Sequence, residues 1–135
     1  MGDPSCLEVV AAVIWRRGRY LAVQRPAGKF MAGYWEFPGG KVEPGETLEQ
    51  ALVRELSEEL AITAVDFFYW RQKTHRYPDR EVQLNFYWIT TFRGTPTPQE
   101  SQAMLWIKPG TGNLPFLEAD LEIVAELATM TLPQA

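Results

Sequence analysis

Apolar and polar positions divide the first forty residues into short strands and loops. Residues 8–15 read Glu-Val-Val-Ala-Ala-Val-Ile-Trp, a run too short and too rich in β-branched residues for a helix. They therefore predict a buried strand. Arg17 and Gly18 indicate a turn, and residues 20–24 predict the returning strand. A loop follows at residues 26–33, and a short strand is expected at residues 35–37, where Pro-Gly-Gly should end it.

The next segment has the pattern of an amphipathic helix. Thr47 and Gln50 have the spacing of a capping box, in which each side chain bonds the backbone of the other residue. Apolar residues then recur every four positions, as on one face of a helix, at Leu48, Leu52, Leu56 and Leu60. The sequence therefore predicts a helix that begins after Thr47 and buries its leucines.

The second half of the chain predicts more strands and a closing helix. Two β-rich stretches, residues 67–74 and 81–92, flank a turn expected at residues 75–79. A last strand is expected at residues 103–107 and a helix at residues 117–127. The apolar face expected for that helix is made of Leu121, Val124, Ala125 and Ala128. The order β-β-β-α-β-β-β-α predicts an α+β fold, a mixed β-sheet packed by two main helices.

Length and composition narrow the function classes. The 135 residues fit one domain, residues 1–135. Thirteen basic and seventeen acidic side chains give a net charge of −4, which argues against a stable nucleic-acid partner. Neither a signal peptide nor a membrane span is evident, since a span needs about 20 apolar residues and the longest run is Val9–Trp15. Cys6 is the only cysteine, so a disulfide within the chain is excluded. We expect a cytoplasmic protein without a membrane partner. The oligomeric state is open, with a monomer the simplest expectation.

Three glutamates of the predicted central helix point to chemistry. Glu55, Glu58 and Glu59 stand at i, i+3 and i+4, within about 100° of one another around the helix axis. Carboxylates this close repel each other and favour a nearby cation. Arg54 is adjacent but points about 100° away, so a divalent ion is the better candidate. Oxygen ligands suit Mg²⁺ or Mn²⁺. The alternative is an ordinary solvated helix face.

The segment around these glutamates resembles a known motif. Residues 40–62 match the Nudix box, G-x5-E-x7-R-E-U-x-E-E-x-G-U, in which U is a bulky aliphatic residue. Gly40 opens the match and Ile62 closes it, and one fixed position departs, since Ala61 stands where the family has glycine. That glycine usually ends the helix, so alanine should either extend the helix or strain its exit. The chain is identified as a member of the Nudix family.

This resemblance implies an α/β/α sandwich and an enzyme that hydrolyses nucleoside diphosphates linked to another group, with Mg²⁺ or Mn²⁺ as cofactor. The expected metal ligands are the carbonyl of Gly39 and the side chains of Glu55, Glu58 and Glu59. Arg54 is expected to orient the glutamates by ion pairing, with Glu46 as its outer acid. The general base that takes the proton of the attacking water is expected to be Glu55 or Glu100.

The resemblance extends beyond the box and suggests a substrate. Residues 35–43 are similar to the segment that precedes the box in MutT-type members of the family, which convert a nucleoside triphosphate to its monophosphate and pyrophosphate. Oxidised nucleotides such as 8-oxo-dGTP are the expected substrates. CTP or a modified dCTP is the alternative, and a binding module without activity is disfavoured because every box glutamate is present. By position, the residues expected to bind the nucleotide are Arg25, Phe37, Arg80 and Asp120.

Each of these assignments has a plain structural alternative. Phe37 could be a core residue, Arg25 and Arg80 solvated surface residues, and Asp120 a helix-capping or first-turn acid. Asp120 also departs from the asparagine carried by the MutT-type enzymes most selective for 8-oxoguanine. An amide donates and accepts hydrogen bonds, whereas an ionised aspartate only accepts them. Asp120 would regain a donor only if burial kept it protonated.

Overall fold

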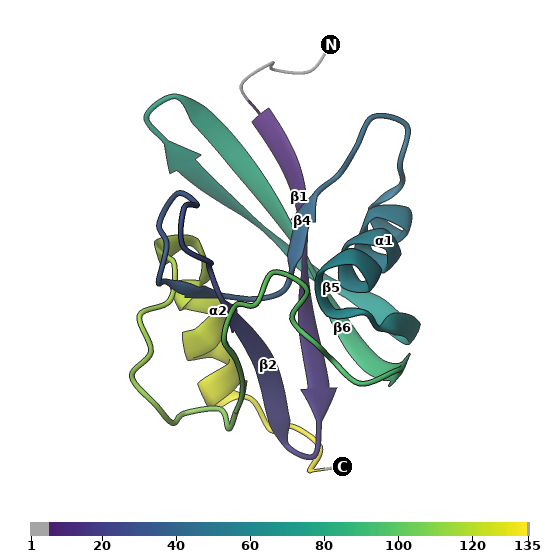
Figure 1. The fold of residues 1–135 in the computed structure, drawn as a ribbon. Coiled ribbons are helices and arrows are strands. Elements are labelled where there is room, and N and C mark those ends of the chain that lie inside the picture. Colours follow the sequence, from purple (N-terminus) through teal and green to yellow (C-terminus); the bar gives the residue numbers. More distant parts are fainter. Residues whose placement is uncertain (1–5, 135) are drawn as a thin grey trace.

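The computed structural model describes residues 6–134 (Figure 1). Its strands are β1 (Cys6–Arg16), β2 (Arg19–Gln24), β3 (Trp35–Glu36), β4 (Gly39–Lys41), β5 (Thr63–Tyr77), β6 (Arg80–Arg93) and β7 (Met104–Ile107). The helices are α1 (Leu48–Leu60) and α2 (Glu118–Thr129). The strands follow the order β3-β2-β1-β6-β5, with β4 paired to β1 and β7 paired to β2. The sheet is mixed, because β1 and β6 run parallel while the other pairs are antiparallel.

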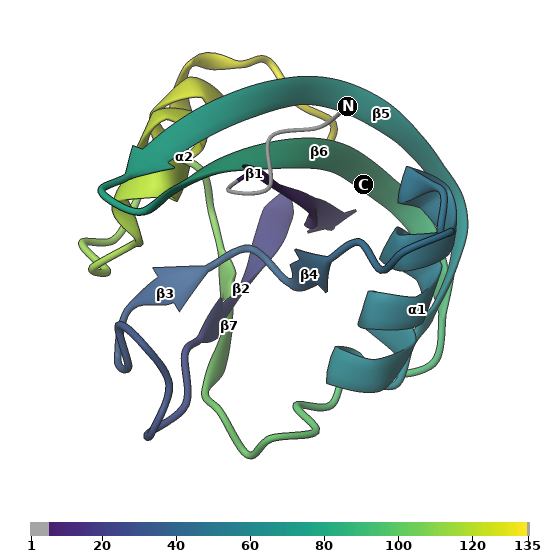
Figure 2. The same ribbon diagram turned by 90° about the horizontal axis from the view of Figure 1, so that it is seen from above.

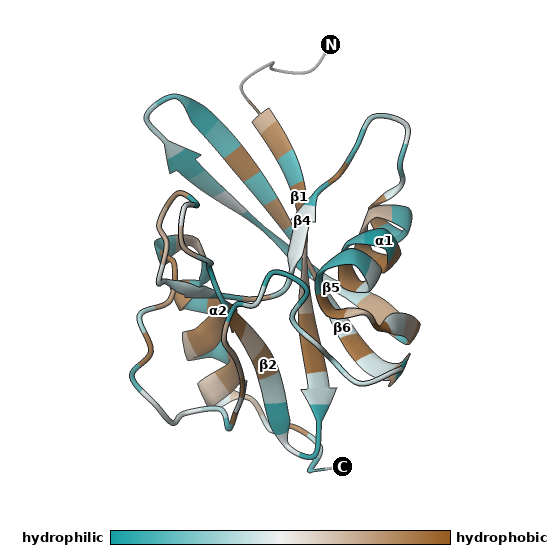
Figure 3. Cartoon of the chain, viewed as in Figure 1, coloured by the Kyte–Doolittle hydropathy of each residue, from teal (hydrophilic) through white to brown (hydrophobic). Residues whose placement is uncertain are grey.

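Helix α1 lies on one side of the sheet and α2 on the other (Figures 1 and 2). Strand β1 explains how both helices are held, since its successive side chains point to opposite faces. Ala11, Val13 and Trp15 belong to the core cluster under α2, whereas Val10, Ala12 and Ile14 belong to the cluster under α1. The continuous apolar run of β1 is therefore a central strand covered on both faces, and Figure 3 colours much of it as hydrophobic.

Two parts of the sheet differ most from the sequence prediction, and β5 also begins at Thr63 rather than at the expected Phe67. Strand β4 was not expected, because Gly39 and Gly40 were taken to end a strand rather than form one. Glycine allows this strand to run very close to β1. The turn expected at residues 75–79 is also wrong, because β5 continues through His75 to Tyr77 and only residues 78–79 turn. Cross-strand pairing extends to Tyr77 opposite Arg80, so the hairpin arm is longer than local sequence indicated.

Helix α2 buries a different face from the one predicted. Ala119, Ile123 and Leu127 pack into the core. Leu121, which was expected to be buried, is 50% exposed, and Ala125 and Ala128 are also exposed. The prediction failed because apolar residues occur on both sides of this short helix, and periodicity alone does not say which side meets the sheet.

Helix α1 ends at Ala61, and the backbone of this residue is strained. This residue adopts φ 57° and ψ 35°, the left-handed conformation, and its N–H bonds the carbonyls of Leu56 and Ser57. The helix therefore stops at Ala61 despite the missing glycine, and the strained exit is the outcome that the structure supports. A side chain with Cβ is disfavoured in this conformation, whereas glycine adopts it readily.

We therefore expect Ala61→Gly to stabilise the protein by about 1 kcal/mol. Urea unfolding followed by circular dichroism measures the change. Ala128→Gly, placed in the ordinary helical backbone of α2, is the matched control and should destabilise by roughly 0.5–1 kcal/mol. Equal destabilisation by both substitutions would contradict the strain at Ala61.

Candidate active site

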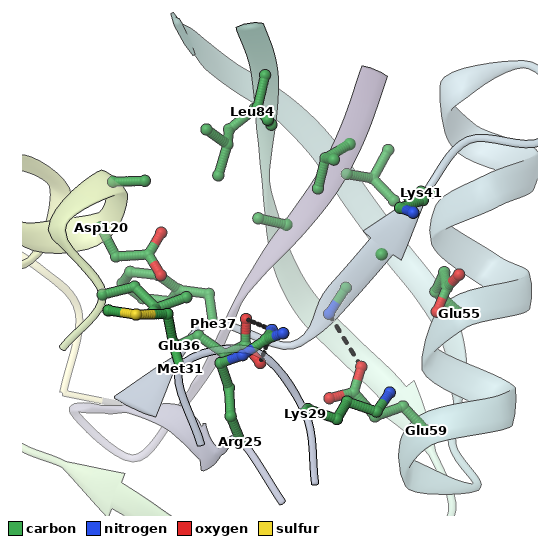
Figure 4. Close-up of a pocket in the computed structure, with 18 of the residues that line it drawn as sticks. Arg25, Lys29, Met31, Glu36, Phe37, Lys41, Glu55, Glu59, Leu84 and Asp120 are labelled. Atoms are coloured by element: carbon green, nitrogen blue, oxygen red, sulfur yellow. Dashed lines mark hydrogen bonds and ion pairs between the residues drawn. The ribbon is translucent and has the colours of Figure 1, made fainter. Parts of the chain in front are cut away.

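A cleft of about 690 Å³ opens between α1, β3, β4, the loop after β2 and the first turn of α2 (Figure 4). It is lined by three glutamates of α1 and by residues at the tip of the long β5–β6 hairpin. Most residues singled out from the sequence line it, namely Arg25, Phe37, Gly39, Arg54, Glu55, Glu58, Glu59, Arg80, Glu100 and Asp120. Glu46 does not line the cleft itself, but it binds Arg54, which does. The fold thus brings together residues from six separate parts of the chain.

The start of α1 is fixed by its cap. The N–H of Gln50 donates to Thr47 Oγ1 at 3.1 Å, and the N–H of Thr47 donates to Gln50 Oε1 at 2.9 Å. This confirms the predicted capping box. Leu52, Leu56 and Leu60 are fully buried against the sheet. Since the leucines fix the rotation of the helix, the glutamates on the opposite side face β4 and the cleft.

The two glycines of β4 let the backbone approach the helix and β1. A Cβ on Gly39 would lie 1.9 Å from the carbonyl oxygen of Val10. A Cβ on Gly40 would lie 2.4 Å from the carboxyl carbon of Glu55. The N–H of Gly39 donates to Glu59 Oε2 at 3.1 Å. Both glutamates are therefore seated directly on the β4 backbone.

Gly40→Ala should lower kcat at least tenfold, because the new methyl group displaces the Glu55 carboxylate. A tenfold change corresponds to about 1.4 kcal/mol of transition-state stabilisation. Steady-state kinetics on the purified variant measures it. Shortening the acid in the double variant Gly40→Ala/Glu55→Asp should relieve the clash and recover part of the stability lost by Gly40→Ala alone. An additive double variant would contradict a direct contact.

Arg54 binds the acids around it, contrary to the helical-wheel expectation. Its Nε donates to Glu46 at 2.7 Å, and its Nη1 lies 3.0 Å from Glu55 Oε1 and 3.3 Å from Glu58 Oε2. Its Nη2 also donates to the carbonyl of Lys41 at 3.0 Å. A long guanidinium side chain curls back along the helix, which a projection of Cβ directions does not show. The hydrogen bond from Arg54 lowers the pKa of Glu46 to about 2.

Glu59 is the box glutamate whose ionisation is opposed most strongly by its surroundings. Burial raises its pKa to about 8, against the opposing effect of the Gly39 N–H, and repulsion from Glu36, Glu55 and Glu100 adds to the rise. Burial likewise raises the pKa of Glu55, although Arg54 opposes it. A cation beside Glu55 and Glu59 would stabilise their ionised forms. Their oxygen donors suit Mg²⁺ or Mn²⁺.

The carboxylates do not form a closed metal cage as they stand. Within residues 6–134, no three His, Cys, Asp or Glu side chains converge on a common ion position. The contacts above give the reason, since Arg54 holds Glu55 and Glu58 while Gly39 holds Glu59. Glu58 is the most open of the three, with 61% of its side chain exposed. The donor chemistry fits a hard divalent cation, and binding one requires these side chains to turn toward it.

Glu100 lies in the loop between β6 and β7, next to Gln99, whose N–H donates to the carbonyl of Glu59 at 2.9 Å. Half of the Glu100 side chain is exposed, and it forms an ion pair with Lys29 Nζ at 3.5 Å. Lys29 belongs to the loop after β2, so this pair joins the two loops that border the cleft. Glu100 and Glu55 both line the cleft, and both stay candidates for the base.

Arg25 lines the cleft, and its guanidinium group is held there by Glu36 and the backbone of Phe30. Its Nη1 lies 3.1 Å from both carboxylate oxygens of Glu36, and its Nε donates to the carbonyl of Phe30 at 2.7 Å. Burial raises the pKa of Glu36, while Arg25 lowers it. Sequence reasoning missed Glu36 as a site residue. The signal that could have identified Glu36 is its position between two aromatic residues, Trp35 and Phe37, in a predicted short strand.

The remaining nucleotide-binding candidates have different surroundings. Phe37 is 4% exposed and packs against Tyr20, Phe86 and Phe116, so it is mainly a core residue that borders the cleft. Arg80 sits at the tip of the hairpin, 5.9 Å above the Tyr77 ring. Sequence reasoning also missed Tyr77, Lys29, Lys41 and Met31 among the lining residues.

Asp120 is the most unusual of these residues. It is 3% exposed, it points into the cleft beside Met31 (Figure 4), and its Oδ1 has no hydrogen-bond partner among the described residues. Burial raises its pKa to about 8, with repulsion from Glu36 adding to the rise. Burial thus favours the protonated form of the carboxyl group, which can donate one hydrogen bond and accept another.

The profile of the NUDIX domain matches residues 9–126. The chain belongs to the Nudix family. The match includes the capped helix, its glutamates and the glycines of β4, so the resemblance read from residues 40–62 is confirmed. The mixed sheet between two helices is the expected α+β sandwich, and the chain is a Nudix hydrolase.

Relatives of this Nudix hydrolase carry two different names. The chain is 42% identical over 127 residues to the CTP pyrophosphohydrolase of Escherichia coli K12, covering 88% of this chain and 94% of that protein. It is 35% identical over 123 residues to the 8-oxo-dGTP diphosphatase of the same strain, covering 90% and 95%. Both relatives align over nearly their full length.

Solved structures agree with the fold. The solution structure of the E. coli ORF135 protein superimposes with a TM-score of 0.80 at 42% identity, covering 90% of this chain and 87% of that one. A MutT structure from a study of Aliivibrio salmonicida and Vibrio cholerae gives 0.79 at 34% identity, covering 91% and 97%. In residues 6–134, neither helix has the length and apolar character needed to cross a membrane.

Proposed function

We propose that the protein is a metal-dependent nucleoside triphosphate diphosphatase that converts its substrate to the monophosphate and pyrophosphate, with oxidised nucleotides such as 8-oxo-dGTP as the main candidates. The observation that carries this proposal is the position of Glu55 and Glu59 against the β4 glycines at one end of the cleft, with the buried Asp120 at the other. The end with the glutamates suits a metal-bound polyphosphate, and the end with Asp120 suits the nucleobase.

In this proposal, Glu55, Glu58, Glu59 and the carbonyl of Gly39 hold Mg²⁺ or Mn²⁺. When bound, the ion neutralises the phosphate charge and polarises phosphorus toward attack by water. Arg54 orients the glutamates through its ion pairs, and Glu46 in turn fixes the guanidinium. Glu55 or Glu100 takes the proton from water. Arg25, Phe37 and Arg80 shape the space for the nucleotide.

Asp120 supports both substrate classes in its neutral form. Its O–H donates and its carbonyl accepts, which matches an edge that presents an N–H beside a carbonyl, as 8-oxoguanine does. Guanine offers two acceptors, N7 and O6, on the corresponding edge, so it lacks the N–H. Cytosine also suits a neutral carboxyl, because its amino group donates and its ring nitrogen accepts. The relative named CTP pyrophosphohydrolase makes a cytosine nucleotide the second candidate.

Initial rates with Mg²⁺ on a nucleotide panel test the proposal, with products identified by phosphorus NMR. The panel contains 8-oxo-dGTP, dGTP, CTP, 5-methyl-dCTP and a dinucleotide polyphosphate, with metal chelation by EDTA as the control. A kcat/KM for 8-oxo-dGTP at least a hundredfold above dGTP corresponds to about 2.7 kcal/mol of discrimination and supports the sanitising role. A preference for CTP selects the second candidate. No turnover on any compound would overturn the enzymatic proposal.

A further inference from the structure

A second groove lies away from the cleft, between β7, α2 and the loop that joins them. Its volume is about 450 Å³, within the range of small-molecule sites. It meets the β1–β2 turn at Arg19, at the end of the sheet where that turn lies in Figure 1. None of the box glutamates and none of the residues assigned to the nucleotide lines it.

The floor of this groove is apolar and open to solvent. Leu105 of β7 is 45% exposed and Leu121 of α2 is 50% exposed, and both line the groove. Val124 and Leu114 complete this surface. Leu121 lies on a side of α2 that the core does not use, whereas Val124 and Leu114 also pack against the core cluster under α2. Exposed apolar side chains that face each other from two elements form a surface that favours an apolar occupant.

The rim of the groove is cationic. Arg19 and Lys108 line it, and neither has an ion pair with any residue in the described part of the chain. Tyr20 pairs with Ile107, so continuing the β2–β7 register places Arg19 beside Lys108. Arg19 and Lys108 thus follow directly on the last paired residues, and like charges at neighbouring positions repel each other unless an anion lies between them.

Charge therefore identifies the occupant that fits. The protein as a whole carries a net charge of −4, yet no acidic side chain is found among the described residues that line this groove. The main cleft is different, because it contains both acids and bases. We propose that the groove between β7 and α2 binds a small organic anion, whose apolar body packs on Leu105 and Leu121 while its anionic group meets Arg19 and Lys108.

Three matched probes test this site on the full chain without divalent metal. They are 1-naphthyl phosphate, 1-naphthol as the apolar body alone, and inorganic phosphate as the charge alone. Backbone amide shifts in NMR titrations locate each probe. We expect 1-naphthyl phosphate to shift the amides of residues 104–114 and 121–124 and to bind at least tenfold more tightly than either fragment.

Variants separate the contributions of charge and apolar surface. Arg19→Gln and Lys108→Gln should each weaken 1-naphthyl phosphate at least fivefold, and Leu121→Glu should abolish binding. Arg93→Gln removes an exposed arginine that does not line the groove and should leave the affinity unchanged. All four positions except Lys108 lie on helices or strands at exposed sites, and unchanged amide spectra elsewhere verify folding.

The proposal is overturned by any of three results. One is amide shifts confined to the main cleft. Another is equal binding of 1-naphthol, which would leave only a hydrophobic surface. The third is an affinity that Arg19→Gln and Lys108→Gln do not change. Because these measurements require no turnover, they stand apart from the nucleotide assays.

Discussion

Replacing Glu59 by Gln should lower kcat at least a thousandfold, which is about 4 kcal/mol of transition-state stabilisation. The amide keeps the shape of the side chain but loses the charge proposed to hold the metal. Glu59 is expected to matter most because its carboxylate is buried on the Gly39 N–H, whereas Glu58 is largely exposed. Steady-state kinetics at several Mg²⁺ concentrations separates a loss of metal affinity from a loss of rate.

The stability of the same variant provides an independent check. A carboxyl group whose pKa is raised to about 8 in the folded state stabilises the metal-free protein below its unfolded pKa and loses that contribution as the pH rises through 8. Glu59→Gln does not titrate, so it should become more stable than the wild type at pH 9. Glu118→Gln, an exposed acid of α2, is the control. Activity within tenfold of the wild type would refute the role of Glu59.

Asp120→Asn should change both the pH dependence of folding and the ranking of bases. The folded-state pKa of Asp120 is raised to about 8, so its stabilising contribution is complete below pH 4 and is lost as the pH rises toward and through 8. Each pKa unit corresponds to about 1.4 kcal/mol. Between about pH 4 and 9, the free energy of unfolding of the wild type should therefore fall by several kcal/mol relative to that of the variant. Urea unfolding of both proteins at pH 4, 6, 8 and 9 measures the difference.

Kinetics of Asp120→Asn distinguish recognition from structure. An asparagine still donates and accepts but loses the titration, so activity should become less dependent on pH between 7 and 9 and the preference among nucleotides should shift. An equal loss of kcat/KM for every nucleotide would mark Asp120 as structural. Asp120→Leu, which removes both hydrogen-bonding functions, should lose discrimination without the changes in metal dependence expected for Glu59→Gln.

Local sequence determined the parts of the fold that depend on local physics. The capping box, the buried leucines of α1 and the turn at Arg17-Gly18 were all predictable, since each depends on residues within one or two helical turns or a hairpin. Strand β4 was not predictable in this way. Gly39 and Gly40 looked like a strand end, and their role is visible only beside Val10 and Glu55, which lie far away in sequence.

The site was predictable where a motif fixed its residues and not where the fold assembled it. Glu55, Glu58 and Glu59 are placed by helical spacing, but the convergence of Arg54 on its acids required a real side-chain conformation. Glu36 was missed because its importance comes from Arg25 and from burial in the cleft. The apolar face of α2 was assigned wrongly because only the tertiary structure shows which side meets the sheet.

Strand β1 has a consequence for how the chain reaches this structure. Its parallel partner β6 comes much later in the chain, with Cys6 pairing with Glu81 and Ile14 with Ile89. Such distant pairing must wait for a large loop to close, which slows folding. Until β6 has been synthesised, the apolar run of β1 lacks its parallel partner and stays open to wrong contacts. In a nascent chain the β1 segment is therefore vulnerable to aggregation until the residues of β6 have emerged.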